Sequence, residues 1–323
     1  MNNYDIYIVR QNSRVYCFYY DEKYAGAVRF RVYENGKWSE SRDVFLSCGR
    51  NFTVNVAKKI MVFCEDRAGN VALCYVYNDI VTSRIIFKSP YDGIIFNAIL
   101  FGETMRLIYG NISSRTFSNH IWGDAVELDA AEQSPYILQE TGANHALVFY
   151  QKNTEVISYG YREITTTQHG KFNPYYQNSI PIYTQSILTT QTAIHIAYVL
   201  KGVFSSKLVY KKKETTEFSA PSLLFEAPSI ENISVYFAED VLYIGFISNN
   251  ALFTIESRDR GDTFCAPELY PNKFCQNTSN VTKAAYLSDT ELSESKFFAR
   301  ELYVDKTRPW DIQILPDLRE DFF

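Results

Sequence analysis

Apolar and polar residues alternate along most of the chain in short runs that end at polar turns. Residues 14–20 are followed by a polar stretch and then by residues 28–33, in which every second side chain can face the same side. Residues 60–64, a turn at 65–69 and a return run at 71–77 repeat this form. The pattern predicts antiparallel β-hairpins. No long window is dominated by helix-forming residues, so we expect an all-β fold.

The hairpins recur at a regular spacing. The centres of their first runs are Phe18, Phe63, Ile108, Phe149, Ala197 and Gly245, separated by 45, 45, 41, 48 and 48 residues. A period in the forties is typical of β-propellers, in which each unit of four short strands forms one blade. A chain of 323 residues then predicts seven blades, and the spacing is also compatible with six or eight.

A strand before each hairpin is expected to be the innermost strand of its blade. The seven segments are residues 4–9, 52–56, 94–100, 136–139, 181–187, 230–237 and 281–286. The last unit is the least regular, since residues 293–304 predict one long strand and residues 309–315 a short one. No linker rich in Pro, Gly or Ser interrupts the series, so we expect one domain over residues 1–323.

One motif in the sixth unit is specific. Ser257, Asp259, Gly261 and Thr263, followed by Phe264, match the pattern S-x-D-x-G-x-T-aromatic. This segment resembles the Asp-box propellers, the superfamily that includes sialidases and related sugar-active or sugar-binding proteins. The pattern predicts a tight turn: the Asp259 carboxylate accepts backbone N–H groups, Gly261 takes a positive φ and Phe264 anchors the turn in the core. In this family such turns are structural and lie away from the binding face.

Composition and charge narrow the partners. The formal net charge of −5 leaves no broadly basic surface, and the only basic run is residues 211–213, so we expect no nucleic-acid binding. No apolar stretch reaches the length that spans a bilayer, and the first residues lack the features of a signal peptide. We expect a soluble, cytoplasmic, bacterial protein, with a surface or spore-associated location as an alternative.

Six cysteines are too few for a disulfide scaffold and lack the paired spacing that holds zinc. Cys64 with Cys74, and Cys265 with Cys275, are near enough in sequence to form disulfides, although free buried thiols are the preferred interpretation for both pairs. The four histidines are scattered without metal-ligand spacing. We therefore expect no metal and no cofactor.

The loops between the second and third strands of the blades are the expected ligand-facing loops. Residues 65–67 and 151–153 fall there, as do residues 21–24 and 249–250. A polar mouth edged with aromatic residues suits a sugar or a peptide. The candidate ligand-binding residues are Arg50, Glu65, Asp66, Arg67, Asp92, Tyr150 and Gln151.

No catalytic set emerges from the sequence. The resemblance implies that an active sialidase would carry three arginines, a tyrosine–glutamate pair and an aspartate, but the Arg-Ile-Pro signature of those enzymes is missing, so no catalytic residue is assigned. The leading hypothesis is a non-catalytic recognition or scaffold propeller that binds a glycan or a protein partner. The alternatives are a sialidase-like glycoside hydrolase with diverged signatures and a structural protein of a surface or spore assembly.

Overall fold

The computed structural model describes residues 5–11, 14–24, 26–56, 59–88, 96–101, 104–109, 113–118, 121–122, 126–130, 136–142, 145–166, 168–270, 278–288 and 297–309. Most of them lie in β-strands, and none of them lies in an α-helix, which confirms the all-β prediction. Within these residues, no helix could cross a membrane. The chain divides into two compact units, residues 1–177 with 287–290 and residues 178–286 with 291–323. The prediction of a single domain stays a prediction.

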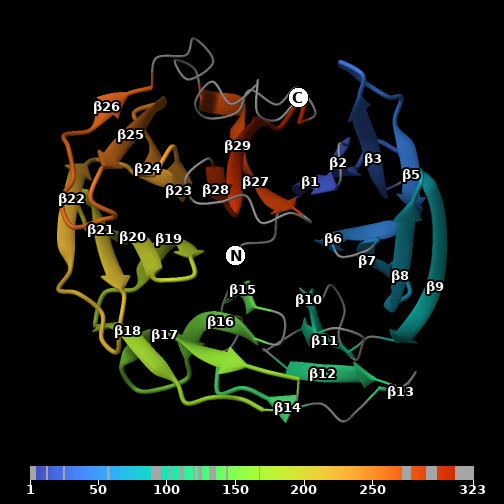
Figure 1. Cartoon of the computed structure of the whole chain (residues 1–323), viewed down its shortest axis with the longest axis horizontal. Helices are drawn as coiled ribbons and strands as arrows, with labels where there is room; N and C mark the ends of the chain where they lie inside the picture. The colour runs from blue at the N-terminus through green and yellow to red at the C-terminus, as the bar shows by residue number, and fades with distance from the viewer. Residues whose placement is uncertain are drawn as a thin grey trace. The chain divides into compact units, whose positions relative to one another are not determined.

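The first unit contains four successive antiparallel sheets, which run from blue to green in Figure 1. Their strands are β1 (Ile6–Gln11), β2 (Arg14–Asp21), β3 (Ala27–Glu34), β4 (Lys37–Trp38) and β5 (Arg42–Phe45); β6 (Cys48–Val56), β7 (Ile60–Asp66), β8 (Asn70–Tyr77) and β9 (Ile80–Lys88); β10 (Phe96–Phe101), β11 (Thr104–Tyr109), β12 (Ser113–Ser118), β13 (Ile121–Trp122) and β14 (Val126–Glu127); β15 (Tyr136–Gly142), β16 (His145–Lys152), β17 (Ile157–Ile164) and β18 (Asn173–Asn178). Consecutive strands of each sheet are joined mainly by short turns.

The second unit continues the same pattern, from yellow-green to red in Figure 1. Its strands are β19 (Ile182–Thr189), β20 (Ile194–Lys201), β21 (Ser206–Lys213) and β22 (Ser222–Ala227); β23 (Glu231–Ala238), β24 (Val241–Ser248), β25 (Ala251–Ser257), β26 (Glu268–Leu269) and β28 (Phe297–Ala299); and the antiparallel pair β27 (Val281–Ser288) and β29 (Glu301–Asp305). A 3-10 turn over Thr278–Asn280 precedes β27.

The core of each unit lies between sheets, where apolar faces meet. In the first unit Ile99 and Ile108 of the third sheet pack against Val148, Tyr150 and Ile164 of the fourth. In the second unit residues of β19–β21 pack in the same way against residues of β23–β25. A four-stranded sheet cannot cover its own apolar face, so neighbouring repeats must stack. This packing, with the four-stranded sheets, is consistent with a β-propeller.

The expected strands are present in the structure. Each of the seven segments predicted as inner strands overlaps a strand of the structure, and six of them pair antiparallel with the hairpin strand that follows. Asn35 and Gly36 both have positive φ, at 52° and 77°, which suits a two-residue hairpin turn. The number of blades stays a prediction.

The prediction of one long strand over residues 293–304 is wrong. A bend at Arg300 divides the segment into β28, which pairs with β23, and β29, which pairs with β27. The reason is a buried polar network that begins directly after the bend. Glu301 accepts from Lys283 at 2.8 Å and from the Ser186 hydroxyl at 2.6 Å. An unpaired buried carboxylate is very unfavourable, so these contacts fix Glu301 at the start of β29. Most of the predicted strand over residues 309–315 lies outside the described residues.

The turn at residues 257–264 has a dense set of internal hydrogen bonds. The Asp259 carboxylate accepts from the backbone N–H groups of Asp262 and Thr263, at 3.0 and 2.8 Å, and from the Ser257 hydroxyl. Gly261 has a φ of 95°, and its N–H donates to Ser257 Oγ at 2.7 Å. The Phe264 ring meets that of Tyr210 edge-on, with 4.8 Å between the centroids. The polar groups of Ser257 and Asp259 are therefore satisfied within the turn, which is attached to the rest of the unit through the Phe264 ring and an ion pair of Asp262 with Lys212 at 2.6 Å.

Cysteines 17, 48, 64 and 74 are free and buried. Burial raises the pKa of the Cys64 thiol well above its ordinary value, so this thiol stays protonated. Cys265 is free but exposed, which corrects the expectation of a buried thiol there. Cys275 lies outside the described residues.

Candidate functional site

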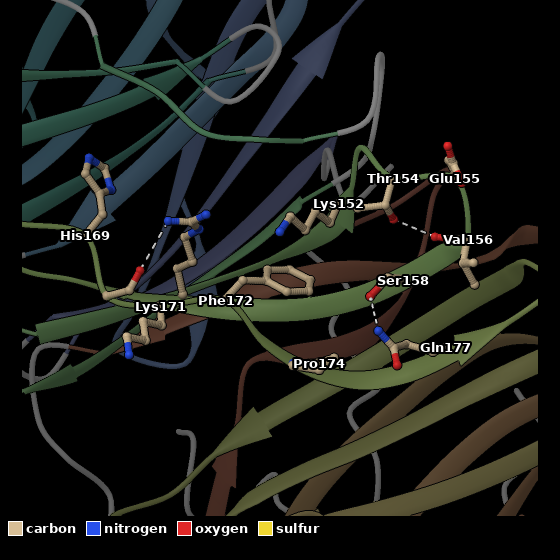
Figure 2. Close-up of a pocket in the computed structure, with 12 residues that line it drawn as sticks. Lys152, Thr154, Glu155, Val156, Ser158, His169, Lys171, Phe172, Pro174 and Gln177 are labelled. Carbon is tan, nitrogen blue, oxygen red and sulfur yellow. Dashed lines mark hydrogen bonds between the residues drawn. The ribbon is translucent and has the colours of Figure 1, made fainter.

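An open groove of about 890 Å³ lies on the fourth sheet of the first unit. It runs from the turn between β16 and β17 across β17 to the connection that leads into β18 (Figure 2). The lining residues are Lys152, Thr154, Glu155, Val156, Ser158, Arg162, His169, Gly170, Lys171, Phe172, Pro174 and Gln177. Its lining thus combines one aromatic ring with hydroxyl, amide and charged groups, the mixture that small-molecule sites use to fix a ligand.

A glycine and a tyrosine position the aromatic part of the groove. A Cβ on Gly160 of β17 would lie 2.5 Å from the Phe172 ring and 2.5 Å from the Asn173 carbonyl oxygen. Only a residue without a side chain allows this close approach. The fully buried Tyr150 ring meets Phe172 edge-on at 5.3 Å between centroids. Phe172 is therefore held against the sheet and projects toward Lys152, as Figure 2 shows.

A carboxylate beside the groove holds two of its cationic side chains. Asp129 Oδ1 accepts from Arg162 Nη2 at 2.8 Å, and Asp129 Oδ2 lies 3.1 Å from Lys152 Nζ. Oδ1 also accepts from the Tyr150 hydroxyl at 2.7 Å. Burial alone would raise the pKa of Asp129, but the hydrogen bonds from Tyr150 and Lys152 and the charges of Arg162 and Lys152 hold it below its usual value. The carboxylate is therefore ionised and orients the cations.

His169 stands at the other end of the groove beside Arg106, which extends from β11. An Nη of Arg106 donates to His169 Nε2, so the imidazole proton resides on Nδ1. Burial first, and then the positive charges of Arg106 and Arg162, lower the pKa of His169 to about 4. The imidazole is neutral at physiological pH, because burial and the two nearby guanidinium groups disfavour its charged form.

The same contacts limit the acid–base chemistry that these groups can perform. The Tyr150 hydroxyl is buried beneath the groove, and burial, followed by its hydrogen bond to Asp129, raises its pKa. The basic nitrogen of His169 is occupied by Arg106. All three side-chain nitrogens of Arg162 donate to protein acceptors: Nε to the Tyr150 hydroxyl, Nη1 to the Gly170 carbonyl and Nη2 to the Asp129 carboxylate. A catalytic base must reach the proton it abstracts, so this arrangement favours binding over proton transfer.

Of the residues predicted from sequence, Arg50 and Arg67 approach Tyr20 in the first unit. Burial, and then Cys48 and Glu22, raise the pKa of Tyr20, and Arg67 and Arg50 oppose that rise. The guanidinium of Arg50 pairs with the carboxylate of Asp5. Arg67 lies in the turn between β7 and β8 and Arg50 lies in β6, and their role in ligand binding stays a prediction.

Two acidic residues of the same loop have other surroundings. Asp66 accepts from the backbone N–H groups of Ala68 and Asn70, both at 2.8 Å, so its carboxylate stabilises its own turn. Glu65 is buried at 3% exposure, which corrects its expected place at an open mouth. Tyr150 is likewise not at a rim, because it is fully buried. Gln151 is half-buried on β16, and Asp92 lies outside the described residues.

The residues predicted from the sequence include only the edge of the groove. The predicted loop at residues 151–153 contains Lys152, and Tyr150 supports the floor, but Phe172, Arg162 and His169 were missed. The available signal was Gly160, since a glycine inside a strand pattern often marks a close approach of another segment. Among the described residues, no three His, Cys, Asp or Glu side chains are arranged to hold a metal ion.

Solved structures of known proteins support the assignment of the fold. No protein-family model and no curated protein matches the chain. Solved structures match at low identity. An ulvan lyase from a new polysaccharide lyase family is 12% identical over 93% of this chain and 91% of its own, with a TM-score of 0.65. The SapL1 lectin in complex with α-methyl fucoside is 11% identical over 84% and 98%, with a TM-score of 0.51.

A puromycin-hydrolysing peptidase from Mycobacterium tuberculosis also matches, with 10% identity, 96% of this chain, 52% of its own chain and a TM-score of 0.55. These likenesses span most of the present chain, and at such identities they concern the fold alone. Together with the four-stranded sheets they define the class: the chain has a β-propeller fold.

Proposed function

We propose that this propeller is a carbohydrate-recognition protein that binds a saccharide in the groove of the fourth sheet without transforming it. The observation that carries the proposal is the Phe172 ring, half-buried among the polar groups of Lys152, Ser158 and Gln177. Sugars present an apolar face to aromatic rings and hydroxyl groups to amides and ammonium groups. The fold supports this reading, because the matched SapL1 structure is a lectin with a bound fucoside.

The turn at residues 257–264 supports a family assignment. We propose that the chain belongs with the Asp-box propellers, because Ser257, Asp259 and Gly261 make the hydrogen bonds and the positive φ expected of that motif. The turn contributes to stability in this proposal and takes no part in binding.

An enzymatic alternative follows from the likeness to a polysaccharide lyase. A tyrosine, an arginine and a carboxylate lie together beside the groove: Tyr150, Arg162 and Asp129. The raised pKa of Tyr150 and its burial oppose a role as a base. We therefore expect binding without turnover.

Titration calorimetry after a glycan-array screen tests the proposal. Phe172→Ala is expected to weaken saccharide binding about tenfold, roughly the worth of one aromatic contact. Phe218→Ala is the matched control, because Phe218 is also a half-buried ring beneath lysines, Lys211 at 5.6 Å and Lys213 at 5.7 Å, but lies outside the groove.

Three outcomes would contradict the proposal. An array and calorimetry without any saccharide binding would remove it. Equal losses from Phe172→Ala and Phe218→Ala would place the binding elsewhere. Release of reducing ends or unsaturated products from a bound polysaccharide would replace recognition with catalysis.

A further inference from the structure

The charges of the groove select among saccharides. Three cationic side chains line it, those of Lys152, Arg162 and Lys171. Two carboxylates are close, Asp129 and Glu155, and Asp129 is already engaged by Lys152 and Arg162. The cations outnumber the carboxylates, so the groove carries a positive potential although the whole chain has a net charge of −5.

The ammonium group of Lys152 is prepared for an acidic ligand. It lies 5.4 Å from the centre of the Phe172 ring and 3.1 Å from Asp129, so its position over the ring is determined by both contacts. An ammonium group has three N–H donors, and the contact to Asp129 uses one of them. The remaining donors can reach a ligand that rests against Phe172.

Two further groups strengthen this preference. Lys171 directly precedes Phe172 in the sequence and also lines the groove. Its side chain is exposed and forms no ion pair with any described residue. At the inner end, His169 Nδ1 is buried without a hydrogen-bond partner among the described residues, and the donation from Arg106 to Nε2 makes Nδ1 an N–H donor. A buried donor without an acceptor is costly, so this N–H group favours negative charge in its surroundings.

We infer that the groove binds an acidic saccharide, in which a carboxylate or sulfate group contacts Lys152 while the sugar ring lies against Phe172. This inference rests on the proposed function and adds the class of ligand. Carboxylate and sulfate offer the same anionic oxygens to the site, so the experiment separates them.

The experiment compares three oligosaccharides of similar length by titration calorimetry at low and at physiological salt. An oligogalacturonate supplies carboxylates, an oligosaccharide of carrageenan supplies sulfates, and a galacto-oligosaccharide is neutral. We expect at least one acidic oligosaccharide to bind about tenfold more tightly than the neutral one at low salt, and we expect this preference to shrink as salt screens the charges.

Two variants connect the preference to the groove. Lys152→Gln is expected to lower affinity for the acidic oligosaccharide about tenfold and to leave affinity for the neutral one within about twofold. Lys171→Gln is expected to lower it about threefold, because this side chain is more exposed. Lys207→Gln is the matched control, since Lys207 also pairs with a carboxylate, Glu226 at 3.9 Å, but lies outside the groove.

The possible outcomes distinguish a preference for acidic saccharides from saccharide binding in general. Equal affinity for neutral and acidic oligosaccharides, or an unchanged preference in Lys152→Gln, would overturn the inference and leave saccharide recognition standing. Equal effects of Lys152→Gln and Lys207→Gln would also overturn it. Absence of binding by all three oligosaccharides and by a broad glycan array would remove the proposed function itself.

Discussion

Two clusters in the molecule are each built from a tyrosine, a glycine and a phenylalanine: Tyr150, Gly160 and Phe172 at the groove, and Tyr210, Gly261 and Phe264 at the 257–264 turn. In each cluster the tyrosine meets the phenylalanine edge-on, at 5.3 and 4.8 Å, and the glycine leaves room for a ring. The surroundings differ. The Tyr210 hydroxyl shares a 2.7 Å hydrogen bond with the buried His195, whereas the Tyr150 hydroxyl contacts the charged Asp129 and Arg162.

The same packing unit can therefore form part of a closed turn or line a groove that is open to a ligand. At the 257–264 turn the polar groups are satisfied within the turn or by neighbouring strands, Asp262 by Lys212 and the Tyr210 hydroxyl by His195, so the cluster is complete without a ligand. At the groove, ionised groups stay beside Phe172 and keep water and ligands in reach. Lysine side chains that line an open groove beside the ring, rather than the ring itself, distinguish the site from the turn.

The largest expected effect comes from filling the two glycines. A Cβ on Gly261 would lie 2.1 Å from Tyr210 Oη, and its φ of 95° disfavours any side chain. We expect Gly261→Ala to lower the free energy of unfolding by about 3 kcal/mol or more, and Gly160→Ala by about 2 kcal/mol. Chemical denaturation followed by tryptophan fluorescence measures both.

The two glycine variants should differ in binding. Gly160→Ala displaces Phe172 and should also weaken saccharide binding, whereas Gly261→Ala should leave the affinity of the folded protein unchanged. A loss of affinity in both variants, measured below their unfolding transitions, would contradict the division between a closed and an open cluster.

A smaller effect is expected from removing the two hydroxyls. Tyr150→Phe leaves Arg162 Nε without its acceptor, so we expect a loss of about 2 kcal/mol of unfolding free energy, and Tyr210→Phe should cost about 1 kcal/mol because its partner is a neutral histidine. Only Tyr150→Phe should alter binding, through a looser Asp129 and Lys152. The comparison would fail if Tyr210→Phe proved the more damaging of the two in both stability and affinity.

The smallest and most specific effect concerns two histidines. Burial, followed by nearby cations, lowers the pKa of both His169 and His195 from 6.5 to about 4. Between pH 6.5 and about 4 the unfolded chain therefore binds protons that the folded chain does not, and stability should decrease as pH falls through this window. His195→Gln should flatten part of that slope. NMR titration of the imidazole protons measures the two pKa values directly.

An acidic oligosaccharide provides a control within the same molecule. A bound anion stabilises the protonated imidazole nearby, so it should raise the pKa of His169 and leave that of His195, which is only 2% exposed, unchanged. A parallel rise of both pKa values would indicate a conformational change rather than local contact with the anion.

Much of the fold could be predicted from local pattern. The alternation around Phe18, Phe63 and Phe149 defines hairpins because side chains of a strand alternate between its two faces. The conformation of the turn at residues 257–264 was predictable because the hydrogen bonds of Asp259 and Gly261 join residues close in sequence. The end of the chain was less predictable, since Glu301 turns inward toward Ser186, 115 positions away.

The candidate site, in contrast, could not be predicted from local pattern. Glu65 falls in the predicted turn over residues 65–69 but lies in β7, and Tyr150 lies in β16; the burial of neither side chain could be inferred from its own position in the sequence. Phe172 becomes part of a site only because Gly160 lets it approach β17 and because Asp129 holds Lys152 beside it. Local sequence determined the strands, their turns and their recurrence, because short-range sterics and side-chain alternation act within a few residues. Only the tertiary structure determined which charged side chains stay exposed beside an aromatic ring, because electrostatics and packing act between segments that are distant in the sequence.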